Sequence, residues 1–229
     1  MAKFDFVWLG LILAGCGQYP NPNDLASLRP ESRAEIANKR LDSAEETLKY
    51  KVEVSREITD EQRNDLIKEL AKDMLTKIDP KAVSDRDQWM YAALLRVTDQ
   101  WPEAEVALEK AVKAAPNVDR KVNDSLKLAQ AQAKNNKIAE AIATANSVLT
   151  IGDADAAPIL PAVLYEIVPA AQGKSHDKEL ADLLAKAIEC HKRVKFSPNS
   201  ESGRAFMVAR SHHIGLAETK IGELSASKN

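Results

Sequence analysis

The sequence predicts an all-α protein. Aromatic residues make up only 5 % of the 229 residues and glycine occurs eight times, whereas alanine is frequent throughout. Apolar side chains recur at i, i+3 and i+4 along most of the chain, which is the spacing of amphipathic helices. One short stretch, Tyr50, Val52 and Val54, alternates with charged residues as a strand does, but it has no partner strand elsewhere in the sequence. This composition and spacing are typical of packed helices.

The chain opens with a short apolar run over residues 6–15, preceded by Lys3. About ten residues is half of what a membrane-spanning helix needs, and the pattern predicts a cleavable signal peptide over residues 1–15. Leu13, Ala14, Gly15 and Cys16 resemble the lipobox of bacterial lipoproteins, in which the cysteine is lipidated and the chain is cut just before it. The resemblance implies a lipid (palmitate-type) anchor on Cys16 and, because Gly17 is not an aspartate, attachment to the outer membrane, facing the periplasm. An ordinary secretory signal with a chance cysteine is the alternative.

A tether and two helices are expected next. Residues 16–30 are rich in proline and asparagine and lack apolar periodicity, so we expect a flexible tether. Residues 31–83 form the N-terminal helices, one beginning near Pro30 and one over residues 59–78 with Thr59 or Asp60 as its N-cap. Residues 49–57 between them could be extended or helical.

Two helices joined by a short turn around Asp99 and Gln100 carry the most informative pattern. Four positions in the second of these helices match the A-x3-F-x2-A-x4-P pattern, namely Ala104, Leu108, Ala111 and Pro116. They resemble the second half of a tetratricopeptide repeat (TPR), with Trp101 in its aromatic position. A diverged second copy follows at a slightly longer spacing, at Ile138, Ala141, Ala145 and Val148, where Asp153 replaces the proline.

A third helix pair, over residues 161–193, is looser. Ser175 is expected to cap its second helix, and Pro169 to kink or shorten its first. The resemblance implies a right-handed α-solenoid of TPR-like helix pairs over residues 84–200, closed by a capping helix and tail at 201–229. A helical bundle without repeat identity is the alternative.

The function follows from the same resemblance. TPR arrays bind peptides or partner proteins in a groove lined by the first helix of each pair. Carried over to this chain, the groove positions are Arg86, Trp89, Ala93, Arg96, Asn123, Leu126, Gln130 and Lys134. A tryptophan flanked by two arginines suits an extended or acidic peptide, since Trp and Arg dominate binding energetics. Alternatively, Trp89 packs against the helix over residues 59–78 and the arginines are solvated.

We therefore expect a lipid-anchored adaptor or assembly factor with an envelope protein or peptide as partner. A permanent accessory subunit of a larger membrane complex is the alternative. The formal net charge of −2 argues against nucleic-acid binding by charge alone.

An enzyme is not expected, and neither is a cofactor or a small-molecule substrate. Cys190 and His191 invite a thiol-enzyme interpretation, but adjacent helical residues point about 100° apart. With Cys16 lipidated, Cys190 is expected to be buried and inert. A zinc site would have to be assembled from His176, Cys190, His191, His212 and His213, none of whose spacings is diagnostic of metal ligands.

Overall fold

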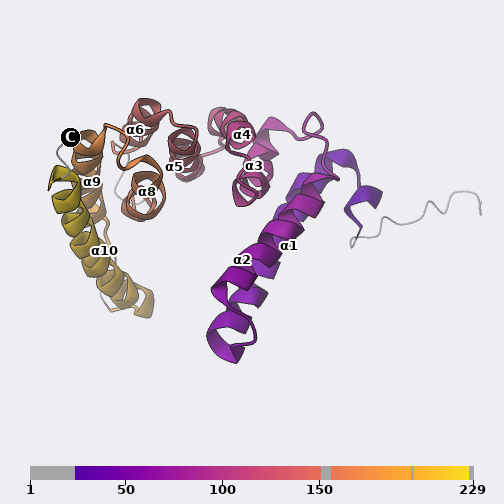
Figure 1. Ribbon diagram of the computed structural model, residues 1–229, viewed down its shortest axis with the longest axis horizontal. Helices are drawn as coiled ribbons and strands as arrows, with labels where there is room; N and C mark the ends of the chain where they lie inside the picture. The colour runs from indigo at the N-terminus through magenta and orange to yellow at the C-terminus, as the bar shows by residue number, and fades with distance from the viewer. Residues whose placement is uncertain (1–23, 151–155, 197–198, 227–229) are drawn as a thin grey trace, which may run out of the picture.

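The protein is all-α. The computed structural model describes residues 24–150, 156–196 and 199–226, and these residues contain helices and turns but no strand. The helices form an arch (Figure 1): α3 to α8 lie along its top, and the α1–α2 pair and the α9–α10 pair descend on either side. The predicted signal peptide, Cys16 and the position of Asp153 lie outside the described residues.

The α1–α2 pair begins the arch. Helix α1 (Arg33–Tyr50) continues directly into a π-helical turn, η3 (Lys51–Ser55), which ends at Arg56 in the left-handed region with φ 52°. The segment left open by the sequence is therefore helical at Lys51–Ser55. Helix α2 (Asp60–Leu75) begins with a capping box, in which the Thr59 side chain accepts from the Gln62 backbone N–H and the Gln62 side chain accepts in return. This confirms Thr59 as the cap.

Residues 24–30, the last part of the expected tether, are ordered against the body. Two short 3-10 turns, η1 (Leu25–Ser27) and η2 (Pro30–Ser32), lead into α1, and Leu25 is only 2 % exposed. The guanidinium of Arg33 donates to the carbonyls of Leu28, Lys77 and Ala26 at 2.8–3.0 Å. One buried leucine and three charged hydrogen bonds hold the segment in place, which composition alone does not predict.

Two helical hairpins form the top of the arch. After the 3-10 turn η4 (Asp85–Asp87), the first comprises α3 (Gln88–Val97) and α4 (Trp101–Ala114), and the second α5 (Val118–Lys134) and α6 (Ile138–Ser147). Their turns have the same geometry 37 residues apart: Asp99 and Asn136 are left-handed, with φ 59° and 63°. The following N–H groups reach back in the same way, Gln100 to Leu95 O at 2.9 Å and Lys137 to Gln132 O at 2.8 Å. The helices approach closely because small residues lie between them, and Ala92, Ala104 and Ala141 have no exposed surface.

The last part of the arch departs from simple helix pairs. Helix α7 (Ile159–Ala162), a π-helical turn η5 (Val163–Ile167) and α8 (Val168–Ala171) form one continuous helical stretch that passes Pro169 and ends two residues later. Helix α9 (Asp177–Arg193) follows, and α10 (Glu201–Ala226) packs along it.

Ser175 does not cap α9. It adopts φ 66°, and the residue at the N-cap is His176, whose side chain makes no capping bond. The Asp177 carboxylate instead accepts from the Gly173 backbone N–H at 2.8 Å. The prediction was wrong because two left-handed residues, Gly173 and Ser175, delay the start of the helix.

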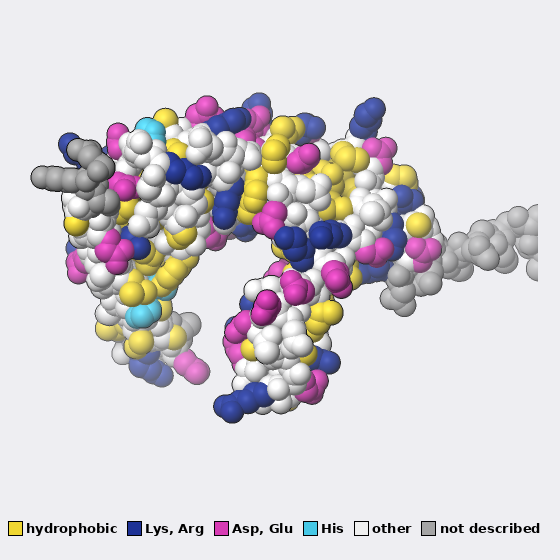
Figure 2. Space-filling model, in the orientation of Figure 1, with side chains coloured by type: hydrophobic (Ala, Val, Ile, Leu, Met, Phe, Trp, Pro, Cys, Tyr) yellow, Lys and Arg dark blue, Asp and Glu magenta, His cyan; other side chains and the backbone are white. Residues whose placement is uncertain are grey.

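The core runs the length of the arch in three adjoining clusters. The largest extends from Val122 on α5 to Leu224 on α10, a second joins Leu25, α1 and α2 to Leu94, and a smaller one fills the first hairpin. None of the described helices has both the length and the apolar composition needed to cross a membrane. The inner side of the arch is hollowed (Figure 2). Helices α3 and α5, each the first helix of its hairpin, contribute to this side.

Candidate functional site

A chain of polar contacts joins the three helical segments along one face. The Arg96 guanidinium on α3 donates to Gln130 Oε1 on α5 from both Nε (3.0 Å) and Nη2 (2.6 Å). Its Nη2 also lies 3.0 Å from Glu166 Oε2 on η5. Arg96 and Gln130, both expected in the groove, therefore meet, and Glu166 joins them. We call the side of α3 and α5 that carries these residues and Lys127 the inner face.

Lys127 also lies on the inner face. It is half-buried, and its ammonium makes no hydrogen bond or ion pair with any residue that the structure describes. Burial lowers the pKa of Lys127, and so do the positive charges of Arg96 and Arg120, against the opposing effect of Glu166 and Asp124. Lys127 is thus a charge held partly out of water beside two other cations.

Leu126 is a correction to the expected groove. It is 3 % exposed and belongs to the large core cluster, so it is not available to a partner. On α5 the half-buried face runs through Asn123, Lys127 and Gln130, and Leu126 is turned toward the core. The repeat pattern assigned Leu126 to the groove, whereas the next residue, Lys127, lies on the inner face. Adjacent residues of a helix point about 100° apart, so one residue decides between core and surface.

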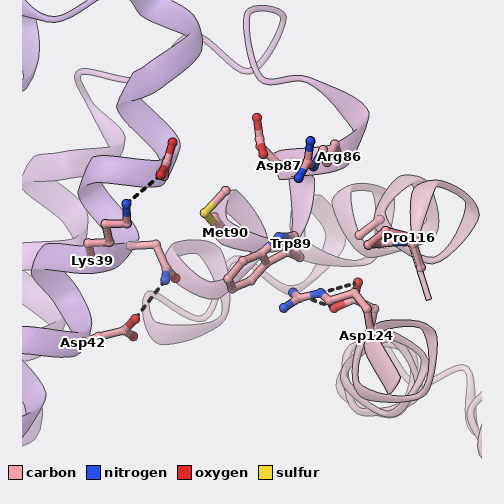
Figure 3. A pocket seen from close by; sticks show the side chains of 13 residues that line it. Lys39, Asp42, Arg86, Asp87, Trp89, Met90, Pro116 and Asp124 are labelled. Atoms are coloured by element: carbon pink, nitrogen blue, oxygen red, sulfur yellow. Dashed lines mark hydrogen bonds and ion pairs between the residues drawn. The ribbon is translucent and has the colours of Figure 1, made fainter. Parts of the chain in front are cut away.

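A cleft opens at the beginning of α3 and α5, with Trp89 at its centre (Figure 3). The Arg120 guanidinium stacks on the Trp89 ring at 3.4 Å from its centroid, and Arg120 also binds Asp124 through Nε–Oδ2 (3.0 Å) and Nη2–Oδ1 (2.9 Å). Only the first of these two contacts is a well-aligned hydrogen bond, because the Nη2 and Oδ1 atoms meet at a poor angle. The cleft measures about 650 Å³. Its lining comes from α1, from η4 and the start of α3, from the end of α4 with the turn after it, and from the start of α5: Glu35, Asn38, Lys39, Asp42, Arg86, Asp87, Trp89, Met90, Ala111, Ala115, Pro116, Arg120 and Asp124.

The cleft and the polar chain belong to the same surface. Trp89 and Arg96 are seven residues apart on α3, and Arg120 and Lys127 are seven apart on α5. Seven residues are about two helical turns, so each pair lies on one side of its helix. The inner face therefore carries an aromatic–arginine stack at one end and a cationic group two turns further on.

The remaining expected groove residues are spread along and around this surface. Arg86 is exposed at the mouth of the cleft, and Ala93 is half-buried on α3. Asn123 bonds within α5 to Asp119 at 3.0 Å, and the Lys134 ammonium lies 5.5 Å from the Trp101 ring at the far end of the helix. The sequence interpretation missed Arg120, Lys127 and Glu166; the seven-residue spacing of Arg120 and Lys127 beside Asn123 and Gln130 is the signal that could have found the first two.

Helix α1 supplies an acidic wall opposite the inner face. Burial raises the pKa of Glu45, the neighbouring Asp42 raises it further, and Arg63, Lys127 and Arg96 oppose the shift. Glu45 forms no ion pair with Lys127. The two carry opposite charges, and Lys127 is near enough to act on the Glu45 carboxyl.

Cys190 and His191, which were considered for thiol or metal chemistry, lie elsewhere, near the end of α9. Cys190 is 3 % exposed and its Sγ donates to Leu149 O at 3.2 Å. His191 is 1 % exposed and stacks near Phe206, with ring centroids 5.3 Å apart. Burial, Arg210 and His213 lower the pKa of His191 to about 4, and the poorly aligned Ala157 backbone opposes the shift weakly.

These residues do not converge on a metal. His191 and His213 are 6.0 Å apart by ring centroids, and His212 and His213 are 6.1 Å apart. His176 lies at the opposite end of α9, near Glu179. Among residues 24–226, leaving out the undescribed gaps, no three potential ligands are grouped as a metal site needs.

Comparison with known proteins adds no family: the chain matches no family model, no curated protein and no solved structure. The function is therefore argued from the inner face itself.

Proposed function

We propose that this protein is an interaction protein with TPR-like helix pairs, acting as an adaptor or assembly factor in the bacterial cell envelope. In this proposal a lipid on Cys16 holds it at the outer membrane, facing the periplasm, and the inner face binds a protein or peptide partner. The observation that carries the proposal is the Trp89–Arg120 stack in an open cleft of about 650 Å³. Tryptophan and arginine are the residues that most often dominate the energy of protein interfaces.

Two further features support a binding role for this face. The turns at Asp99 and Asn136 repeat the same backbone geometry, so each hairpin joins its two helices through the same kind of turn. Arg96 is already held by Gln130 and Glu166, and Arg120 by Asp124. Because the arginines are held in place beforehand, a partner loses less side-chain entropy on binding.

The test is affinity purification from cross-linked, detergent-solubilised membranes. The intact chain is compared with Trp89→Ala/Arg86→Ala, which removes two cleft residues without disturbing the Arg96 network. The matched control is Val106→Ala/Lys110→Ala on α4, where Val106 is 55 % exposed and Lys110 is exposed. Loss of one partner in the cleft variant alone supports the proposal, and retention of every partner by that variant contradicts it.

The anchor is tested separately. Cys16→Ser is expected to abolish incorporation of labelled palmitate and to release the protein from the membrane fraction. Unchanged labelling and fractionation of this variant would contradict the lipoprotein part of the proposal.

A permanent structural subunit is the second candidate, and one observation favours it. Helix α10 exposes three large apolar side chains: Val208 is 74 % exposed, Met207 45 % and Leu216 40 %. If these residues are an interface that is covered in a complex, the isolated chain will associate or aggregate. A stable monomer by size-exclusion chromatography with light scattering would count against this candidate.

A further inference from the structure

We infer that the inner face binds a carboxylate of its partner between Lys127 and Arg96, so that the partner segment is acidic at this point. The inference rests on the proposed function, and it names the chemistry that the inner face selects. The carboxylate can come from an Asp or Glu side chain or from the free carboxyl terminus of the partner.

The first step is the incomplete state of Lys127. An ammonium that is held partly out of water loses hydration energy, and proteins normally return that energy through a hydrogen bond or an ion pair. Lys127 has neither among the described residues, although Arg96 and Arg120 on the same face both have carboxylate partners. A single anion beside Lys127 would give this ammonium a partner of the kind that Arg96 and Arg120 already have.

The second step is the charge pattern around it. Arg96 and Arg120 both act on Lys127 as positive neighbours, while Glu166 and Asp124 are engaged by these arginines. Arg96 is fixed from two sides by Gln130 and Glu166, so its position is set before a partner arrives. A carboxylate at this position would form charge-assisted hydrogen bonds, the stronger class of polar contact.

The third step is continuity with the cleft. Trp89 lies about two helical turns from Arg96, and Arg120 about two turns from Lys127. An extended segment seated on the Trp89–Arg120 stack needs about three residues to span the roughly 10 Å to Lys127. The acidic residue is therefore expected at a fixed distance from the residue that packs on Trp89.

The acidic side chains of α1 weaken the preference of the inner face for an acidic partner segment. Glu45 faces the same hollow and repels a carboxylate placed there. Glu45→Gln is therefore expected to tighten binding of an acidic segment. If Glu45 were itself the partner of Lys127 in solution, the two single variants and the double variant would show strong coupling in thermal unfolding.

The experiment is a peptide selection on the purified full chain. Two random libraries are displayed, one with internal peptides and one with free carboxyl termini, and bound peptides are recovered by competition. Affinities of the selected peptides and of their amide counterparts are then measured by fluorescence anisotropy on the native chain and on the variants Trp89→Ala, Lys127→Met, Lys127→Arg and Lys121→Met. Lys121 is exposed and lies about 120° around α5 from Lys127, so its replacement removes the same charge from the same helix but from another side.

The expected result is an Asp, a Glu or a terminal carboxylate at one fixed position. Lys127→Met should then weaken binding by about 10-fold or more, as loss of a charged hydrogen bond does, whereas Lys127→Arg and Lys121→Met retain it. The library that yields the peptides tells a side-chain carboxylate from a terminal one.

Five results would overturn the inference. Selected peptides that depend on Trp89 but carry no fixed acid, or that ignore Lys127→Met, would leave the proposed function standing without this site. Equal weakening by Lys127→Met and Lys121→Met would indicate general charge attraction, and strong Glu45–Lys127 coupling in unfolding would assign Lys127 an internal partner. If neither library yields a peptide that depends on Trp89, both the inference and the proposed function fail.

Discussion

Replacing Leu126 by alanine tests where the inner face of α5 begins. Leu126 is 3 % exposed in the large core cluster, so truncation removes three buried carbon atoms. At ~0.8 kcal/mol for each carbon the transfer loss is about 2.4 kcal/mol, and the cavity that remains brings the total to about 3–4 kcal/mol. For a chain of this size that is a fall in melting temperature of roughly 6–16 °C.

The assay is thermal unfolding followed by circular dichroism at 222 nm, with two comparison variants. Leu66→Ala is the matched control, because Leu66 is 45 % exposed and its truncation is expected to cost ~1 kcal/mol or less. Lys127→Met, one residue along, should leave the melting temperature unchanged or raise it, since it removes an unpaired, half-buried charge. If Leu126→Ala costs no more than Leu66→Ala, Leu126 is on the surface and the assignment of the inner face is wrong.

Three further predictions concern other buried groups. Glu105 is 4 % exposed, and its carboxylate accepts hydrogen bonds from Asn135 at 2.6 Å and from Lys137 at 2.8 Å. Glu105→Ala should therefore lower the free energy of unfolding in urea by about 2–3 kcal/mol. A neutral effect would show that this carboxylate does not tie α4 to the α5–α6 turn. Cys190 is buried, so maleimide labelling of Cys16→Ser protein should be slow until denaturant is added; fast labelling of the native protein would contradict its burial. The pKa of His191 is lowered to about 4, whereas a histidine in the unfolded chain titrates near 6.5, so stability is full above pH 6.5 and falls toward pH 4. His191→Phe should make the melting temperature fall less steeply over this pH range. An unchanged slope would show that His191 does not cause the fall.

The fold class and most helices could be predicted because they depend on local signals. Thr59 and Gln62 form a capping box that is visible in the sequence, and the turn at Asp99 is bounded by apolar periodicity on both sides. Short polar side chains tolerate the left-handed conformation, which is why Asp99 and Asn136 can hold the two equivalent turns.

The parts that could not be predicted depend on contacts between distant residues. Leu25 is ordered because α1 and α2 provide a pocket for it, and Arg33 is fixed by a carbonyl 44 residues away. Buried Glu105 looks like any exposed helical carboxylate in the sequence, since its partners come from the next hairpin. The π-helical turn η5 has no sequence signature either, yet it carries Glu166, the carboxylate that holds Arg96.

Some of the residues expected in the groove lie together, and one does not. Trp89, Arg96 and Gln130 do lie on neighbouring helices, whereas Leu126 is buried and Lys127 takes its place on the surface. A shift of one residue on a helix exchanges a core side chain for a surface one, and a diverged repeat pattern does not fix the rotation of α5 that closely.

The most direct test of the central claim is photo-cross-linking in intact cells from single positions on the arch. A photoreactive phenylalanine derivative is placed at position 89 in the cleft and, in a second strain, at position 106 on the outer surface of α4. A discrete cross-linked species from position 89 and none from position 106 is the expected result. Cross-links from position 106 with none from position 89 would show that partners bind another face and would contradict the account.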